Sequence, residues 1–238
     1  DVSISLINGH GFTVREDLGD LGTDGRYYSP WYPLLSFIAL PFVATGELVS
    51  RILGVSARHS SGFFALTVNV IITSITAIMV AKMSRKLGSS AKWSLIAALI
   101  YSLSTFAFVY GRKFFAEPLV ALLAITAFHS SFQTGRRYLV VASIASGLAV
   151  LAKPTAILLG PVISVYYLLT RKQTKAFVSP IIGSVAGLLL YGIYNQLRFG
   201  SPLNFGERPG FGVSSFFQAF LGLLVSPGFG ILWYAPAL

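Results

Sequence analysis

The 238-residue sequence has no cysteine, only three histidines and only eight acidic residues. The lack of cysteine excludes a disulfide framework and a thiolate metal site. His10, His59 and His129 lie far apart and form no HxxxH or HExxH spacing, so no local zinc motif is present. The sequence therefore establishes no cofactor. A divalent cation is the candidate that stays open, with no metal ligands assigned.

Charge of either sign is scarce, whereas apolar residues are abundant. Charged residues make up 11% of the chain and hydrophobic residues 54%, and the mean hydropathy is +0.72. Crossing about 30 Å of hydrocarbon takes about 20 apolar residues. Four runs without a charged residue therefore predict membrane spans, at residues 62–81, 93–111, 118–135 and 176–197.

The formal charge of +10 raises the question of nucleic-acid binding. That function needs basic residues on one face or in one tract. The basic residues instead cluster at the ends of the predicted spans, which excludes nucleic acid as a partner and, by the positive-inside rule, predicts a cytoplasmic location for the clusters. The three clusters are Lys82, Arg85, Lys86 and Lys92; Arg136 and Arg137; and Arg171, Lys172 and Lys175.

Residues 138–170 are basic at both ends, and a single helix of this length would measure about 50 Å, too long for one straight crossing. We therefore predict a hairpin that breaks at the sequence AKPT. Pro154 removes a backbone donor and disfavours helix at the preceding residue, which places Lys153 at the outer tip.

The resulting topology places several charged residues together on the exterior. They are Arg112, Lys113, Glu117, Lys153, Arg198, Glu207 and Arg208. The first 30 residues are expected there too, and they hold Asp1, Glu16, Asp17, Asp20 and Asp24, five of the eight acids.

The segment 33–53 permits two interpretations. It could cross the membrane, or it could form a juxtamembrane or re-entrant helix, with Tyr27, Tyr28, Trp31 and Tyr32 at headgroup depth. With the second interpretation, residues 1–61 form an external loop and helix, and residues 62–238 form an incomplete transmembrane bundle. The predicted fold is all-α, a polytopic helix bundle in a fragment truncated at both ends.

Four motifs occur in this order: SPWYPLL at 29–35, RKFFAE at 112–117, GLAVLAKPTAILLGP at 147–161 and YNQLRFGSPLNFG at 194–206. This series resembles the GT-C superfamily of membrane glycosyltransferases, in particular the protein O-mannosyltransferases and the lipid A aminoarabinose transferases. The chain departs from the family pattern in having Glu117 where Asp is usual and no Lys or His before the prolines of the first motif. The resemblance favours the juxtamembrane interpretation of 33–53.

The resemblance implies transfer of a sugar, with inversion, from a polyprenyl-phosphate carrier to a glycan, lipid or protein acceptor. The enzyme would be a multi-pass protein of the plasma or inner membrane, in contact with membrane lipids, with its active site on the extracytoplasmic side. The principal catalytic Asp is expected before residue 1, with Asp1 as its neighbour and Glu117 as a further catalytic carboxylate. The residues expected to bind the donor and its lipid phosphate are Arg112, Lys153, Asn195, Arg198, Tyr28 and Tyr32.

Simpler interpretations remain open for the same residues. Glu117 precedes Pro118 at a helix start, where an acid favours the helix dipole. Arg112, Lys153 and Arg198 fit interfacial anchors or loop cations. A different protein class, a multispan transporter or flippase for a lipid-linked or anionic substrate, would use the same cations, although only one broken helix and no internal repeat are found.

Overall fold

The computed structural model describes residues 2–171, 174–206, 216–227 and 230–234. Helices dominate this part of the chain, which confirms the all-α prediction. The only strands in these ranges are β1 (Asp20–Leu21) and β2 (Tyr27–Tyr28), a short antiparallel pair. The remaining elements before the bundle are α1 (Val2–Ile7), η1 (Glu16–Leu18) and α2 (Pro33–Leu53).

The bundle contains long helices at the predicted spans 62–81 and 176–197 and a shorter helix, of 15 residues, at the predicted span 118–135. Its helices are α3 (Ala57–Lys86), α4 (Ala91–Leu103), α5 (Phe106–Tyr110), α6 (Glu117–Ser131), α7 (Arg136–Ala152), α8 (Leu159–Arg171) and α9 (Thr174–Phe199). The predicted span 93–111 is not one continuous helix, because the chain breaks between α4 and α5. There the Thr105 hydroxyl accepts a hydrogen bond from the Ala107 N–H and caps the second helix.

The predicted hairpin is confirmed, and it breaks at the predicted place. Helix α7 ends at Ala152, Lys153 is extended (φ −162°, ψ 116°), and Pro154 begins the 3₁₀ segment η2 (Pro154–Leu158). Because proline has no N–H and restricts the residue before it, the helix ends there. Lys153 consequently lies at the turn between two helices.

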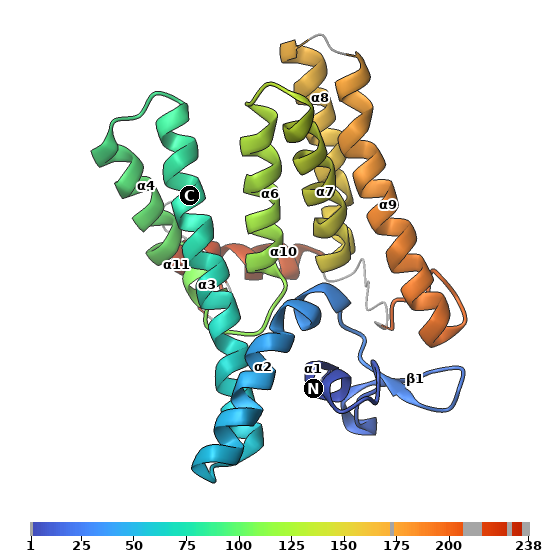
Figure 1. The fold of residues 1–238 in the computed structure, drawn as a ribbon. Helices are drawn as coiled ribbons and strands as arrows, with labels where there is room; N and C mark the ends of the chain where they lie inside the picture. Colours follow the sequence, from blue (N-terminus) through green and yellow to red (C-terminus); the bar gives the residue numbers. More distant parts are fainter. Residues whose placement is uncertain (1, 172–173, 207–215, 228–229, 235–238) are drawn as a thin grey trace.

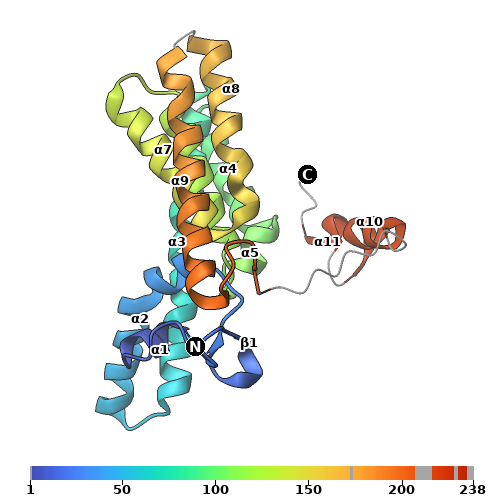
Figure 2. The ribbon, with the colours of Figure 1, turned by 90° about the vertical axis from the view of Figure 1, so that its right-hand side faces the viewer.

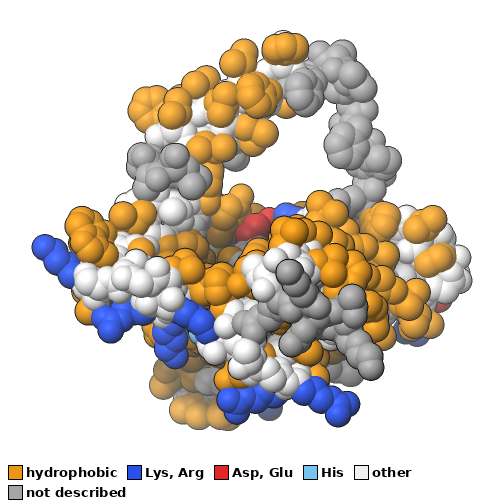
Figure 3. Space-filling view, turned by 90° about the horizontal axis from the view of Figure 1, so that it is seen from above, with side chains coloured by type: hydrophobic (Ala, Val, Ile, Leu, Met, Phe, Trp, Pro, Cys, Tyr) orange, Lys and Arg blue, Asp and Glu red, His pale blue; other side chains and the backbone are white. Residues whose placement is uncertain are grey.

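The turns between α3 and α4, α6 and α7, and α8 and α9 all lie at one end of the bundle (Figure 1). We call it the basic end, and its described cations are Lys82, Arg85, Lys86, Lys92, Arg136 and Arg137. Figure 3, viewed toward this end, shows Lys and Arg side chains gathered along its edge. Lys172 lies outside the described residues. Glu117 and Lys153 lie at the opposite end, where α6 begins and α7 ends.

Small residues and one apolar cluster hold the helices together. A Cβ added to Gly187 would lie 2.2 Å from the Gly147 carbonyl oxygen, so α7 and α9 pack closer than side chains there would permit. Near the opposite end, α2, α3, α6 and α7 meet in one cluster, which fixes α2 beside Glu117 and Lys153. Its buried members are Leu35, Ala39, Val43, Val68, Ile72, Leu119 and Ala152.

Three helices of the described residues are long and apolar enough to cross a membrane, over Pro33–Leu53, Ala57–Lys86 and Phe177–Phe199. The first, α2, lies beside the N-terminal half of α3 and extends away from the basic end (Figure 1). The juxtamembrane interpretation of α2, which the family resemblance favours, stays a prediction. Helices α10 (Phe216–Val225) and α11 (Ile231–Tyr234) lie apart from the bundle (Figure 2).

Candidate functional site

Glu117 and Lys153 form an ion pair at the end of the bundle opposite the basic end. The Lys153 Nζ donates to Glu117 Oε1 at 2.7 Å, and the two side chains are 32% and 35% exposed. Glu117 is the first residue of α6, and Lys153 follows the last residue of α7. Two charged residues from separate predicted connections therefore meet, as expected for a shared site.

A cavity of about 530 Å³ lies beside this pair. Its wall is built from the N-terminal segment, the segment before and at the start of α2, the loop before α6, and the turn after α7. The polar lining residues are Ser29, Tyr32, Ser36, Glu117, Lys153 and Thr155, and the apolar ones are Val2, Val14, Leu18, Trp31, Leu35, Phe114, Phe115 and Ala116. An apolar pocket with a few convergent polar groups is the usual form of a ligand site.

The loop that carries Glu117 is anchored by Asn69 of α3. The Asn69 side chain is fully buried, and its Nδ2 donates to the carbonyls of Lys113 at 2.5 Å and Phe115 at 2.8 Å. Two hydrogen bonds from one rigid amide fix the path of the loop into α6. Sequence reasoning missed Asn69, although an amide in the middle of a charge-free span is a signal, because such a group needs partners inside the bundle.

Arg198 does not line the cavity. Its side chain is buried, 2% exposed, and its guanidinium lies 3.7 Å from the Tyr194 ring centroid. Its Nη1 donates to the Ser29 carbonyl, and its Nη2 donates to Asn195 Oδ1 at 2.7 Å. These contacts favour a positioning role for Arg198 and Asn195, since they tie the end of α9 to a segment that forms the cavity wall. Direct donor binding by either residue stays untested.

Arg112 also lies outside the cavity lining. Its exposed guanidinium lies 4.2 Å from the Phe108 ring centroid, a cation–π contact within α5 and the loop that follows. Of the residues Glu117, Lys153, Arg112 and Arg198, the first two line the cavity and the two arginines do not. Donor binding by the arginines stays a prediction. Both arginines lie at the same end of the bundle as Glu117 and Lys153. Arg112 contacts Phe108, and Arg198 contacts Ser29 and Asn195.

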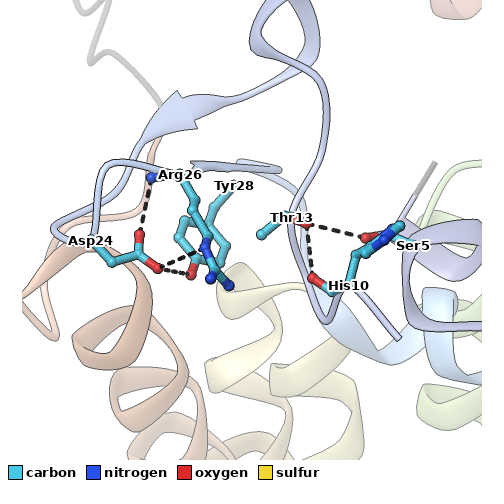
Figure 4. Close-up of polar contacts among 6 residues, drawn as sticks. All are labelled: Ser5, His10, Thr13, Asp24, Arg26 and Tyr28. Carbon is cyan, nitrogen blue, oxygen red and sulfur yellow. Dashed lines mark hydrogen bonds and ion pairs between the residues drawn. The ribbon is translucent and has the colours of Figure 1, made fainter. Parts of the chain in front are cut away.

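The two tyrosines expected at the site have different environments. Tyr32 lines the cavity, and its ring meets Tyr191 edge-on with centroids 5.7 Å apart. Tyr28 instead donates a hydrogen bond from its hydroxyl to Asp24 Oδ2 at 2.8 Å, within the β1–β2 hairpin drawn in Figure 4. The same view shows Thr13, whose hydroxyl donates to the His10 carbonyl at 2.8 Å.

The β1–β2 hairpin is attached to the bundle and carries a carboxylate with a shifted pKa. The Thr23 N–H donates to the Arg198 carbonyl at 3.2 Å, so its turn contacts the end of α9. The Tyr28 hydroxyl and the Arg26 N–H both donate to Asp24 and hold the pKa of Asp24 below its ordinary value of 3.8. Asp1, Glu207 and Arg208 lie outside the described residues. Within those residues, no group of three or more His, Asp or Glu side chains is placed to hold a metal ion.

We expect the β1–β2 hairpin to lose stability in acid, when Asp24 becomes protonated. A carboxylate whose pKa is lowered by folding stabilises the folded form above its ordinary pKa of 3.8, and this contribution disappears as the pH falls through the lower folded value. Amide hydrogen exchange, corrected for intrinsic rates, should show falling protection of the Arg26 N–H below about pH 3.8. The fall should be absent in Asp24→Asn. Equal pH dependence in both proteins would contradict this assignment.

In the comparison with known protein families, the family model for dolichyl-phosphate-mannose-protein mannosyltransferase matches residues 48–195. The matched region extends from α2 nearly to the end of α9 and includes Asn69, Glu117 and Lys153. No curated protein and no solved structure gives a significant match to the chain.

Proposed function

Because the chain belongs to the dolichyl-phosphate-mannose-protein mannosyltransferase family of GT-C membrane glycosyltransferases, we propose that it transfers a sugar from a polyprenyl-phosphate carrier to an acceptor hydroxyl. The observation that carries the proposal is the Lys153–Glu117 pair beside a largely apolar cavity. The cavity offers an ammonium for a phosphate and apolar surface for a lipid. The family match supports a transferase over the transporter or flippase alternative.

The proposed reaction is one displacement with inversion at the sugar carbon. The acceptor oxygen forms the new bond and loses its proton to a carboxylate, while the bond to the phosphate oxygen breaks and its electron pair stays on the phosphate. Lys153 stabilises the charge that develops on this leaving group. Glu117 orients the ammonium at 2.7 Å. The family resemblance implies a further carboxylate, distinct from Glu117, as the principal base.

We test the function by assaying transfer from polyprenyl-phosphate sugars in membranes and detecting both the glycosylated product and the released polyprenyl phosphate. Glu117→Gln should lower the rate about tenfold or more, because the partner that orients Lys153 is lost and misplacement of a reacting group is costly. Glu47→Gln, the same chemical change on α2 outside the cavity lining, is the matched control. No transfer from any such donor by the folded wild-type protein would refute the proposal.

The proposed active site faces the extracytoplasmic side. The basic end carries the described Lys and Arg clusters, and such clusters stay on the cytoplasmic side of membranes. Glu117 begins α6 and Lys153 follows the last residue of α7, and these helix ends lie at the other end of the bundle (Figure 1). A donor that presents its phosphate at the outer headgroup level would therefore meet Lys153.

The predicted orientation can be measured with single cysteines, since the chain has none of its own. Lys113→Cys, exposed beside the cavity loop, should react with an impermeant thiol reagent in intact cells. Arg136→Cys, exposed at the basic end, should react only after the membrane is permeabilised. The reverse pattern would show that the proposed site faces the cytoplasm.

A further inference from the structure

A second hollow lies between α3 and α4, far along the bundle from the Lys153 site. It has a volume of about 390 Å³, and its lining is apolar apart from Ser102 and two cations that lie toward the basic end of the bundle. Its floor consists of the small residues Ala77, Ala81 and Ala98, and its sides include Ile78, Leu95 and Leu99. The cations are Lys82 and Arg85. We call this hollow the α3–α4 groove.

The groove is part of the folded bundle and not a gap between loose helices. Ser90 caps the start of α4 by accepting from the Trp93 N–H, and the Ser94 hydroxyl donates to the Ser84 hydroxyl at 3.3 Å. These contacts join α3 and α4 at the basic end. Below them, the alanines on the groove floor leave room that larger side chains would fill.

The dimensions of the groove match one membrane leaflet. From Ala77 to Arg85 the helix rises about 12 Å, and half of the hydrocarbon thickness is about 15 Å. With the basic end at the cytoplasmic surface, as proposed above, Lys82 and Arg85, one helical turn apart, would lie at the level of the headgroups. The exposed leucine and isoleucine side chains would then lie at acyl-chain depth.

The charge at the mouth of the groove is uncompensated. Among the described residues, neither Lys82 nor Arg85 takes part in an ion pair. The acids of the chain fall at residues 1–24, 47, 117 and 207, and none lies on α3 or α4. An anion entering from the membrane would therefore find two cations above an apolar channel.

We propose that the α3–α4 groove binds an anionic glycerophospholipid of the cytoplasmic leaflet, with its phosphate on Lys82 and Arg85 and one acyl chain along Ala77, Ala81 and Ala98. A basic pocket between transmembrane helices is a chemically suitable site for such a headgroup. The site is separate from the proposed transferase site. It predicts a selective lipid contact whether or not sugar transfer is found.

The test uses the cysteine-free chain reconstituted in vesicles. Leu103→Cys, exposed on α4 one turn beyond Leu99 and outside the groove lining, is labelled with a bimane. Its fluorescence is measured with nitroxide-labelled phosphatidylglycerol or nitroxide-labelled phosphatidylcholine at equal mole fraction. The groove should prefer phosphatidylglycerol roughly 5- to 25-fold, about fivefold for each cation near the surface. Equal quenching by the two lipids would overturn the proposal.

Three further variants, each in the labelled protein, separate the groove from general surface charge. Lys82→Gln with Arg85→Gln should abolish the preference. Arg136→Gln with Arg137→Gln removes the same charge from the same end and should retain it. Ala81→Leu fills the groove without changing charge and should abolish it as well. A preference that survives both the Lys82 and Arg85 change and Ala81→Leu would place the lipid elsewhere.

Discussion

Lys153→Ala is expected to lower sugar transfer about 100-fold or more, the range for losing one preorganised group that stabilises developing charge. Lys153 Nζ lies beside the cavity, held by Glu117 at 2.7 Å. An interaction with the phosphate that strengthens as the sugar–phosphate bond breaks lowers the barrier more than it tightens binding. The turnover rate at saturating donor should therefore fall, with protein expression and folding largely retained.

Two variants define what Lys153 contributes. Lys153→Arg should recover part of the activity, because the charge is kept while the planar guanidinium differs from an ammonium. Lys113→Ala removes an exposed lysine from the loop before α6, outside the cavity lining, and should transfer at close to the wild-type rate. Wild-type transfer by a folded Lys153→Ala protein would return Lys153 to the role of an interfacial anchor.

Arg198→Ala is expected to destabilise the protein by roughly 2–6 kcal/mol, at about 1–3 kcal/mol for each buried acceptor left without a partner. The two acceptors are the Ser29 carbonyl and Asn195 Oδ1, and Arg198 itself is 2% exposed. Thermal unfolding of the purified protein should show the loss. Transfer should fall too, because Ser29 lies in the cavity wall.

Arg112→Ala is the matched control for Arg198→Ala. It removes the same side chain at an exposed position, where the partner is one side of the Phe108 ring. Its expected cost is below about 1 kcal/mol, the usual value of an exposed cation–π contact. An Arg198→Ala protein as stable as the wild type but inactive would favour direct contact between Arg198 and the donor over the positioning role.

The sequence was sufficient for the elements whose cause is local. Charge-free runs located the helices α3, α6 and α9, and Pro154 located the hairpin break, because a missing N–H acts wherever it occurs. The break between α4 and α5 was not predicted, since Thr105 has a capping role only when the chain around it leaves the helix. In the sequence, Thr105 looks like any other polar residue in an apolar run.

The site was only partly predictable from the sequence. Glu117 and Lys153 were expected on one side of the membrane. Their contact depends on how α6 and α7 pack against each other, and the spacing of the two residues in the sequence does not predict that packing. Arg198 follows an apolar span, a position that suits a headgroup anchor as well as a buried partner. Its burial depends on the Ser29 carbonyl, far away in sequence.

The measurement closest to the central claim is photo-crosslinking with a polyprenyl-phosphate sugar that carries a photoreactive group near its phosphate. We predict crosslinks on the peptides that contain Phe114 and Thr155, two residues that line the cavity with Lys153. An excess of unlabelled donor should remove them. Competable crosslinks confined to other parts of the chain, such as the α3–α4 groove, would contradict the assignment of the Glu117–Lys153 cavity as the donor site.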